Sequence, residues 1–233
     1  MLNRPHHQRI ARVLGALNGP LLCAHHCLFG GGTAIALKFG EYRESGDIDF
    51  LVSEIDFYRK LRHALTGVEG LRAITRQGAI PLELAGAVTA DQYGIRTRVA
   101  VDGQPIKLEI VLEGRMALTP PGKGDEICGV ATLTPLDMAT SKLLANSDRW
   151  PDDGVFSRDL IDLAMMQPSL RLLRQAVAKA EGAYGESILR DLGRAIDRMQ
   201  SRTGWLERCM EVMSMADAKA VVWQRIRALR RVL

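Results

Sequence analysis

Two short motifs in the first fifty residues carry side chains suited to phosphate and metal chemistry. Gly31-Gly32-Thr33 is a glycine turn that leads into a predicted short helix. The start of a helix offers free N–H groups and the positive end of the helix dipole to a phosphate, and glycine allows a close approach to the backbone. Thr33 can cap this helix or donate its hydroxyl to a phosphate oxygen. The motif therefore predicts a phosphate site.

The second motif, Asp47-Ile48-Asp49, begins a predicted strand. Residues two apart in a strand point to the same face, so we expect the two carboxylates side by side, with Ile48 and Phe50 in the core. Neighbouring carboxylates repel unless a cation lies between them, and oxygen ligands suit Mg²⁺ or Mn²⁺. This spacing predicts a divalent metal site at Asp47 and Asp49. The alternative is an acidic strand end at a surface turn.

Together the two motifs, GGTAIALKFGEYRESGDIDF, resemble the opening signature of the polymerase-β-like nucleotidyltransferases. The Gly-Gly-Thr form is most similar to the AbiEii/AbiGii toxin branch of that superfamily. The resemblance implies transfer of a nucleoside monophosphate from an NTP to an acceptor hydroxyl, with release of pyrophosphate. It assigns Gly31, Gly32 and Thr33 to the nucleotide phosphates. A Rossmann fingerprint and a P-loop are both excluded, because neither consensus is present.

The superfamily uses a third carboxylate on a later strand, and the candidate here is Glu109 in IKLEIVLEG. Leu108 and Ile110 alternate with it, so Glu109 lies on the polar face of a half-buried strand. The resemblance makes Glu109 a metal ligand together with Asp47 and Asp49. A solvent-facing glutamate is the ordinary alternative, and Glu113, near the strand end, is a poorer candidate.

The later stretch KLLANSDRWPDDGVFSRDLIDL is similar to the branch's helical lysine followed by Arg-Asp-Leu-x-Asp-Leu. The resemblance assigns Lys142 to the triphosphate, as a point charge, and Asp159 to the catalytic set. Asp159 would position the acceptor or the ribose, whereas Asp49 or Glu109 would act as the base. Arg149 is a further residue that could face phosphate.

Helical spacing predicts that Asp159 lies within an apolar stripe, between Phe156 and Met166. A buried carboxylate requires a partner, and the candidates are Lys142, Arg158, a metal or a substrate hydroxyl. An ion pair that pins two helices together is the structural alternative. Asp162, one turn further on, lies at the edge of the stripe.

Periodicity and turn residues predict the elements that position these side chains. The opening helix, 5–18, has an apolar face at Ile10, Val13, Leu14 and Leu17, and Asp102-Gly103-Gln104 is a hairpin signal. Further helices are expected at 33–39 and 54–66, and strands at 21–29, 47–53, 71–76, 95–101 and 106–112. After the helix start at Thr134-Pro135, helices are expected at 135–146, 155–166, 168–180, 185–200 and 204–231, the last broken near Ser214.

The fold class is therefore α/β (α+β), a nucleotidyltransferase-type mixed sheet flanked by helices and followed by an all-α C-terminal domain. We expect a catalytic domain over 1–125 and a helical domain over 126–233 that closes the cleft. Pro120, Pro121, Gly122 and Gly124 mark the connection between them.

The composition is that of a soluble globular protein: 233 residues, of which 47% are hydrophobic and 25% charged. This composition excludes fibrous and disordered classes, and no apolar run is long enough to span a membrane. We expect a cytoplasmic protein with four reduced cysteines and no membrane partner. A net charge of +4 favours an anionic partner.

The resemblance also implies a bacterial toxin–antitoxin system, with an antitoxin protein as partner and the 3′ end of tRNA as an acceptor. The arginines at the C-terminus are equally compatible with RNA, a solvated helix face or an acidic antitoxin surface. Three alternatives stay open: a small-molecule nucleotidyltransferase of the aminoglycoside-modifying type, a catalytically degenerate nucleotide-binding or interaction module, and an Asp-x-Asp glycosyltransferase.

Overall fold

The computed structural model describes residues 2–233, which divide into two compact units. The first contains the chain up to Lys38 together with Ser45–Thr134, and the second contains Phe39–Glu44 and Pro135–Leu233. The short segment Phe39–Glu44 thus belongs to the second unit, although both of its neighbours in the chain belong to the first. It is part of the spacer between the glycine motif and the Asp-x-Asp motif.

A mixed sheet forms the framework of the first unit. Strand β2 (Ile48–Val52) pairs antiparallel with β1 (Leu28–Gly30) and parallel with β6 (Gln104–Leu112). Strand β5 (Gly94–Val101) is antiparallel to β6 and also pairs with the short strands β3 (Glu83–Leu84) and β4 (Thr89–Ala90). A separate two-stranded ribbon contains β7 (Glu126–Ile127) and β8 (Val130–Ala131).

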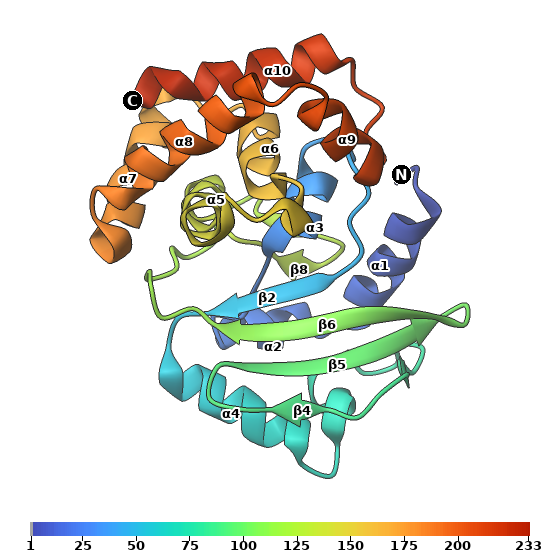
Figure 1. Ribbon diagram of the computed structural model, residues 1–233. Helices are drawn as coiled ribbons and strands as arrows, with labels where there is room; N and C mark the ends of the chain where they lie inside the picture. The colour runs from blue at the N-terminus through green and yellow to red at the C-terminus, as the bar shows by residue number, and fades with distance from the viewer. Residues whose placement is uncertain (1) are drawn as a thin grey trace. The chain divides into compact units, whose positions relative to one another are not determined.

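Helices surround this sheet, as Figure 1 shows. They are α1 (Pro5–Ala16), α2 (Gly19–Ala24), α3 (Gly31–Lys38) and α4 (Ile55–Thr66), with a 3₁₀ turn, η1, at Gly70–Ile74. The predicted apolar face of the first helix is confirmed for Ile10, Val13 and Leu14, which are buried. The helix ends at Ala16, before the expected residue 18, and Leu17 is buried in the extended segment that follows it. Helix α3 packs against β1 and β2.

Two expected strands of the first unit are wrong. Residues 21–29 form helix α2 followed by the three-residue strand β1, because Asn18 accepts a hydrogen bond from the Leu21 N–H at 3.1 Å and so caps a helix start. Residues 71–74 belong to η1, in which Leu71 and Ile74 are buried, and Thr75 after it forms only an isolated bridge with Leu17.

The hairpin between β5 and β6 is confirmed. Val101 pairs with Gln104, and the two turn residues, Asp102 and Gly103, have φ of 53° and 71°. Positive φ at both central positions is the signature of a type I′ turn, which matches the twist of the strands it joins. Asp-Gly is a favoured sequence there, so the local signal and the fold agree.

The second unit is helical. Its elements are α5 (Pro135–Arg149), η2 (Asp153–Val155), α6 (Arg158–Met165), α7 (Leu170–Tyr184), α8 (Ser187–Ser201), α9 (Trp205–Val212), α10 (Lys219–Ala228) and η3 (Leu229–Val232). Helix α5 is central and contacts α6, α7 and α8, while α10 packs on α6 (Figure 1). The mixed α/β class with a C-terminal run of helices is confirmed, and so is the break near Ser214. No helix within residues 2–233 combines the length and apolarity of a membrane span.

The start of α6 differs from the expected helix at 155–166. The Asp152 side chain accepts a hydrogen bond from the Gly154 N–H at 2.8 Å and so caps the 3₁₀ turn η2, and Phe156 and Ser157 then both adopt positive φ. The helix therefore begins only at Arg158. Phe156 does not continue the apolar stripe of α6, and its ring stacks on Trp205 with 6.1 Å between centroids.

Candidate active site

Three adjacent strands of the first unit bring the predicted glycine and carboxylate motifs into register. Gly30, directly before the glycine motif, pairs with Asp49, and Asp49 pairs with Glu109. Neighbouring strands lie about 4.8 Å apart and paired residues share a face, so the Asp49 and Glu109 side chains project from the same face of the sheet. Asp47 lies exposed, two residues before Asp49, at the entry to β2.

The opposite face of the same strands belongs to the core. Ile48 pairs with Leu108 and Phe50 with Ile110, and all four side chains are buried. Because strand side chains alternate, this burial fixes the orientation of the carboxylates between them. The sequence pattern predicted both faces correctly.

Gly31 lies against the carboxylate of Asp49. Its φ is +68°, and a Cβ placed on Gly31 would lie 2.3 Å from Asp49 Oδ2 and 2.9 Å from Asp49 Cβ. Both the backbone conformation and the close approach require glycine. The first residue of α3 is thus packed directly against the carboxylate of Asp49.

Thr33 joins the glycine motif to the segment that precedes Asp47. Its buried hydroxyl donates a hydrogen bond to Ser45 Oγ at 2.8 Å, and the Ser45 N–H donates to His7 Nε2 at 3.2 Å. The hydroxyl proton of Thr33 is therefore directed at Ser45 in this structure. Ser45, which the sequence did not single out, places a second hydroxyl at the start of α3.

Glu109 is held by two cations. It accepts hydrogen bonds from Arg96 Nε at 2.6 Å and from Lys107 Nζ at 2.5 Å, and its side chain is 13% exposed. Hydrogen bonding to Glu109 raises the pKa of Lys107, and the charges of Glu109, Asp47 and Asp49 add to the rise, whereas desolvation opposes it. The Lys107 ammonium thus experiences the field of all three carboxylates.

The predicted ligands fit a hard divalent cation by their chemistry. Asp47, Asp49 and Glu109 supply only oxygen atoms, and Lys107 already places a positive charge in their field. Within residues 2–233, no three His, Cys, Asp or Glu side chains are gathered around a single point. Metal binding by these three residues would therefore include side-chain rearrangement, with the Glu109 contacts to Arg96 and Lys107 loosened.

In the second unit, Lys142 on α5 and Asp159 on α6 lie together. Lys142 Nζ is 3.0 Å from Asp159 Oδ1 and 2.7 Å from Asp162 Oδ2. Arg149, the last residue of α5, donates to both oxygens of Asp159, through Nε at 2.7 Å and Nη2 at 3.0 Å. The partner that a buried Asp159 requires is thus supplied by two cations of the neighbouring helix.

Asp162 anchors the segment Phe39–Glu44 to the same cluster. It accepts hydrogen bonds from the Tyr42 hydroxyl at 2.6 Å and from Arg43, through Nε at 2.6 Å and Nη2 at 3.0 Å. Tyr42, Arg43 and Asp162 are all buried. Asp162 therefore joins Lys142 to the spacer between the two N-terminal motifs, a role that its position at the edge of the stripe did not reveal.

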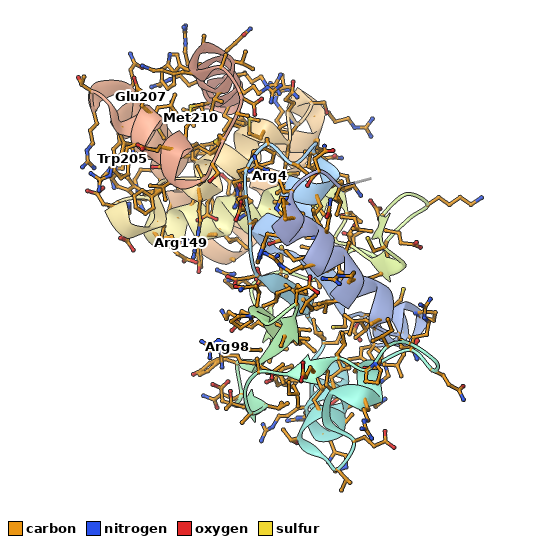
Figure 2. The ribbon with its side chains drawn as sticks, turned by 90° about the vertical axis from the view of Figure 1, so that its right-hand side faces the viewer. Arg4, Arg98, Arg149, Trp205, Glu207 and Met210 are labelled. Atoms are coloured by element: carbon orange, nitrogen blue, oxygen red, sulfur yellow. The ribbon has the colours of Figure 1, made fainter. Side chains whose placement is uncertain are left out.

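These five charged groups form a buried cluster, defined here as Arg43, Lys142, Arg149, Asp159 and Asp162. Burial alone raises the pKa of both aspartates, but Lys142, with Arg149 for Asp159 and Arg43 for Asp162, lowers each pKa below its usual range. Three cations and two carboxylates leave one positive charge in excess. Arg149, labelled in Figure 2, is the most accessible member, with its side chain 36% exposed.

Asn146 adds an unpaired donor beside this cluster. It is buried on α5, four residues after Lys142 and three before Arg149, so the three side chains share one helix face. Its Nδ2 makes no hydrogen bond to the described part of the chain. An unsatisfied buried amide is uncommon, and its N–H groups are available to donate to a ligand.

Sequence reasoning overlooked several of these residues, although a signal existed for some of them. Lys107 alternates with Glu109 on the polar face of the same strand, so their proximity follows from a period of two. Arg96 lies directly opposite Glu109 in the hairpin of β5 and β6, so their proximity follows from the register that the predicted Asp102-Gly103 turn sets. Arg43 carried no such signal, because its partner Asp162 lies 119 residues later and meets it only in the folded structure.

The family comparison agrees with the motifs. Residues 12–228 match the family model described as nucleotidyl transferase AbiEii toxin, type IV toxin–antitoxin system. No curated protein gives a significant match.

Two crystal structures of Helicobacter pylori proteins share the fold. One is a protein assigned as a nucleotidyltransferase, with 16% identity, a TM-score of 0.53, and coverage of 97% of this chain and 93% of the other. The second is JHP933, with 16% identity, a TM-score of 0.54, and coverage of 97% of this chain and 90% of the other.

Proposed function

Because the chain belongs to the AbiEii nucleotidyl transferase toxin family of type IV toxin–antitoxin systems, we propose that it transfers a nucleoside monophosphate from an NTP to an acceptor hydroxyl. The observation that carries this proposal is the register of Gly30, Asp49 and Glu109 across three adjacent strands. This register places the start of α3, whose first residues are glycines that suit phosphate binding, beside Asp49 and Glu109, whose carboxylates suit a metal ion.

The residues of the first unit take the following roles in this proposal. Gly31, Gly32 and Thr33, at the start of α3, bind phosphate oxygens through backbone N–H groups and a hydroxyl. Asp47, Asp49 and Glu109 hold Mg²⁺ or Mn²⁺. When bound, such ions stabilise the negative charge on the attacking and leaving oxygens of an in-line displacement.

The acceptor hydroxyl then loses its proton to a carboxylate. We assign this base role to Asp49 or Glu109, the two carboxylates that pair across β2 and β6. The acceptor oxygen attacks the α-phosphorus, the bond from that phosphorus to the bridging oxygen breaks, and pyrophosphate leaves. Each bond formed is matched by one broken, and no redox partner takes part.

The buried cluster supports a role for the second unit in phosphate binding. Its excess positive charge and the accessible side of Arg149 suit the triphosphate or the leaving pyrophosphate. Lys142 supplies charge to this field from a buried position, and Asp159 orients both Lys142 and Arg149. In this proposal Asp159 acts by holding the two cations in place.

We further propose that the acceptor is tRNA and that a separate antitoxin protein is the partner. The family's place in type IV toxin–antitoxin systems supports the antitoxin. The net charge of +4 supports a polyanionic acceptor. A small-molecule acceptor of the aminoglycoside type is polycationic, and it would require an acidic pocket.

Label transfer tests the proposal directly. The purified protein is incubated with Mg²⁺, each α-labelled NTP in turn and total bacterial tRNA. The Asp47→Asn/Asp49→Asn variant should lose label transfer, whereas Asp56→Asn, which removes an exposed carboxylate of the same unit, should retain it.

Three results would be distinguishable. Label on tRNA with the wild type alone would establish the transferase and identify its nucleotide. NTP binding without labelled RNA would overturn the tRNA assignment and favour a small-molecule or protein acceptor. Absence of both binding and transfer would favour a degenerate module.

A further inference from the structure

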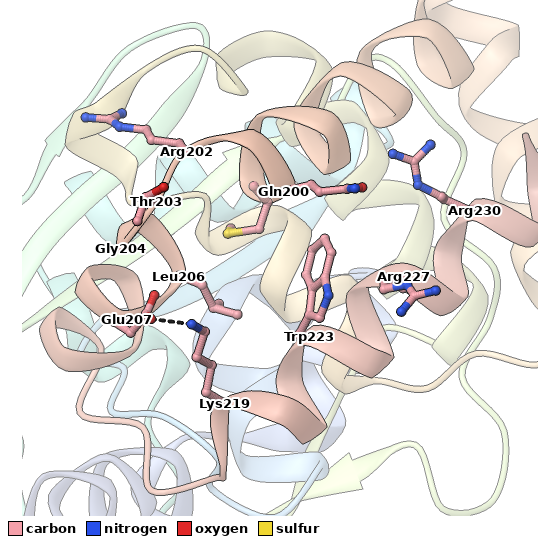
Figure 3. A pocket seen from close by; sticks show the side chains of 11 residues that line it. Gln200, Arg202, Thr203, Gly204, Leu206, Glu207, Lys219, Trp223, Arg227 and Arg230 are labelled. Carbon is pink, nitrogen blue, oxygen red and sulfur yellow. Dashed lines mark hydrogen bonds and ion pairs between the residues drawn. The ribbon is translucent and has the colours of Figure 1, made fainter.

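The second unit contains a cavity of about 560 Å³ that includes none of the residues discussed above as an active site. Helices α8, α9 and α10 border it, and its lining includes Met199, Gln200, Leu206, Trp223, Arg227 and Arg230. Figure 3 shows the indole of Trp223 projecting from α10 into this space. The volume falls within the range typical of small-molecule sites.

Most cations around the cavity already have an acidic partner. Lys219 pairs with Glu207, which also lines the cavity, and Arg230 pairs with Asp197. Arg202 pairs with Asp153 at 2.6 Å, and its guanidinium lies 4.1 Å from the Trp205 ring centroid. These ion pairs hold the side chains at the cavity rim in place. They also neutralise most of the positive charge that Lys219, Arg230 and Arg202 could offer to a ligand.

Arg227 is different. Its guanidinium makes no hydrogen bond or ion pair with any residue in the range 2–233, and the side chain is exposed at the cavity. Arginine offers five N–H donors in a planar arrangement that matches phosphate oxygens. Arg227 is thus an available phosphate donor on the same helix as Trp223, one turn away.

Trp223 provides a flat apolar wall. Its side chain is half-buried, and its indole N–H has no hydrogen-bond partner within the described chain. Met199 and Leu206 extend the apolar surface around it. An accessible indole beside an available guanidinium is the combination that binds a base by stacking and its phosphate by hydrogen bonding.

We propose that this cavity binds a nucleotide, with the base stacked on Trp223 and the phosphate held by Arg227. An acidic peptide would use the guanidinium but would gain little from the flat ring. The two sources of such a ligand are a free mononucleotide and a nucleotide within single-stranded RNA. The inference does not depend on catalysis, because it concerns binding by a separate set of residues.

The other arginines near the C-terminus are engaged elsewhere, which leaves Trp223 and Arg227 as the candidate binding pair. Arg225 lies 3.8 Å from Asp217, and Arg231 donates to the Pro168 carbonyl. Both line a different cavity, on the other border of α10. The arginines near the C-terminus therefore do not form a uniform basic face. We assign phosphate binding to Arg227, because it is the one among them with no partner in residues 2–233.

Binding measured without metal tests this proposal and keeps it separate from the transferase. The full-length protein in EDTA is titrated with adenosine monophosphate and, separately, with a fluorescently labelled ten-nucleotide oligoadenylate RNA. Stacking should quench the Trp223 indole. Trp223→Ala should weaken binding about tenfold, and Trp223→Phe should restore most of it, because the ring is kept.

Arg227→Ala should also weaken binding and should reduce the salt dependence of RNA binding by about 0.7 in the log–log slope. It alters an exposed, unpaired side chain, so its folding should be that of the wild type. Arg174→Ala removes an exposed arginine of α7 outside the cavity and is the matched control, with affinity expected within twofold of the wild type.

The two probes identify the source of the ligand. Equal, Trp223-dependent affinity for both probes would assign a mononucleotide site, and clearly tighter binding of the RNA would assign an RNA site; either result supports the proposal. Wild-type affinity in both Trp223→Ala and Arg227→Ala would overturn it. Displacement of the RNA by polyglutamate, with no effect of Trp223→Ala, would also overturn it and indicate a general anion surface.

Discussion

The guanidinium of Arg43 forms a two-point hydrogen bond with the carboxylate of Asp162, in which Nε and Nη2 lie 2.6 Å and 3.0 Å from the two oxygens. Arg43 lies in the spacer between the glycine and Asp-x-Asp motifs, and Asp162 lies in the Arg-Asp-Leu-x-Asp-Leu sequence, 119 residues later. Both are buried. The contact makes the spacer part of the helical unit.

Removal of the Asp162 charge should strongly destabilise the protein. Asp162→Asn leaves Arg43 and Lys142 buried with reduced compensation, so we expect a loss of about 3–5 kcal/mol in the free energy of unfolding. Urea denaturation followed by circular dichroism measures it. Asp56→Asn, which breaks an exposed pair with Arg59, should cost less than about 1 kcal/mol. Similar losses in the two variants would contradict the role of the cluster.

Acid should remove the stabilisation that Asp159 and Asp162 provide. Their pKa values are lower in the folded protein than in the unfolded chain, where an aspartate titrates near about 3.9. The folded state therefore binds fewer protons, and its advantage is complete at neutral pH and declines as the pH falls below about 4 toward the folded pKa values.

The Asp162→Asn variant checks this sign. Its difference in unfolding free energy from the wild type should be largest at pH 7 and should shrink between pH 5 and pH 3, because protonated Asp162 resembles asparagine. Urea unfolding at each pH gives the difference. A constant difference over this range would show that Asp162 does not titrate in the predicted direction.

Gly31→Ala should damage the proposed active site. The new Cβ would lie 2.3 Å from Asp49 Oδ2, and the backbone φ of +68° disfavours any side chain. We expect a loss of about 1–3 kcal/mol in stability and a larger fractional loss of label transfer, because Asp49 must move. The matched change Gly15→Ala, in α1, meets no atom within 4 Å and should be neutral or stabilising. Full transfer by Gly31→Ala would argue against Asp49 as a central residue.

The Asn146→Leu variant should change thermal stability and label transfer in different directions. The unpaired Nδ2 costs free energy in the folded state, and leucine has a similar size without a polar atom, so the variant should be as stable as the wild type or more stable by about 1 kcal/mol. If the amide donates to bound nucleotide, label transfer should fall in the same variant. Thermal unfolding and label transfer are measured together. A large loss of stability would mean that Asn146 has a structural partner.

Several features of this protein follow from local sequence. The apolar alternation in β2 and β6 predicts which face of each strand is buried, and the positive φ that Asp102 and Gly103 adopt favours the hairpin. The glycine turn followed by Asp-x-Asp predicts the candidate site. These signals succeed because strand alternation and turn conformation depend on neighbours in the chain.

Local sequence was misleading where a capping side chain or a backbone turn competed with apolar periodicity. Asn18 caps α2 within a run that reads as a strand, and the turn at Phe156 and Ser157 delays the start of α6. In both places a hydrogen bond from a main-chain N–H to a polar side chain, Asn18 or Asp152, outweighed the hydrophobic pattern.

The sequence by itself determined the mixed α/β class, the family motifs and the alternating faces of the strands, because each is encoded over a few neighbouring residues. Only the tertiary structure decided which distant charges meet: it brings Arg43 to Asp162 and leaves Arg227 with no partner in residues 2–233. A buried charge takes its partner from whichever segment the fold brings within about 3 Å, and distance along the chain carries no information about that choice.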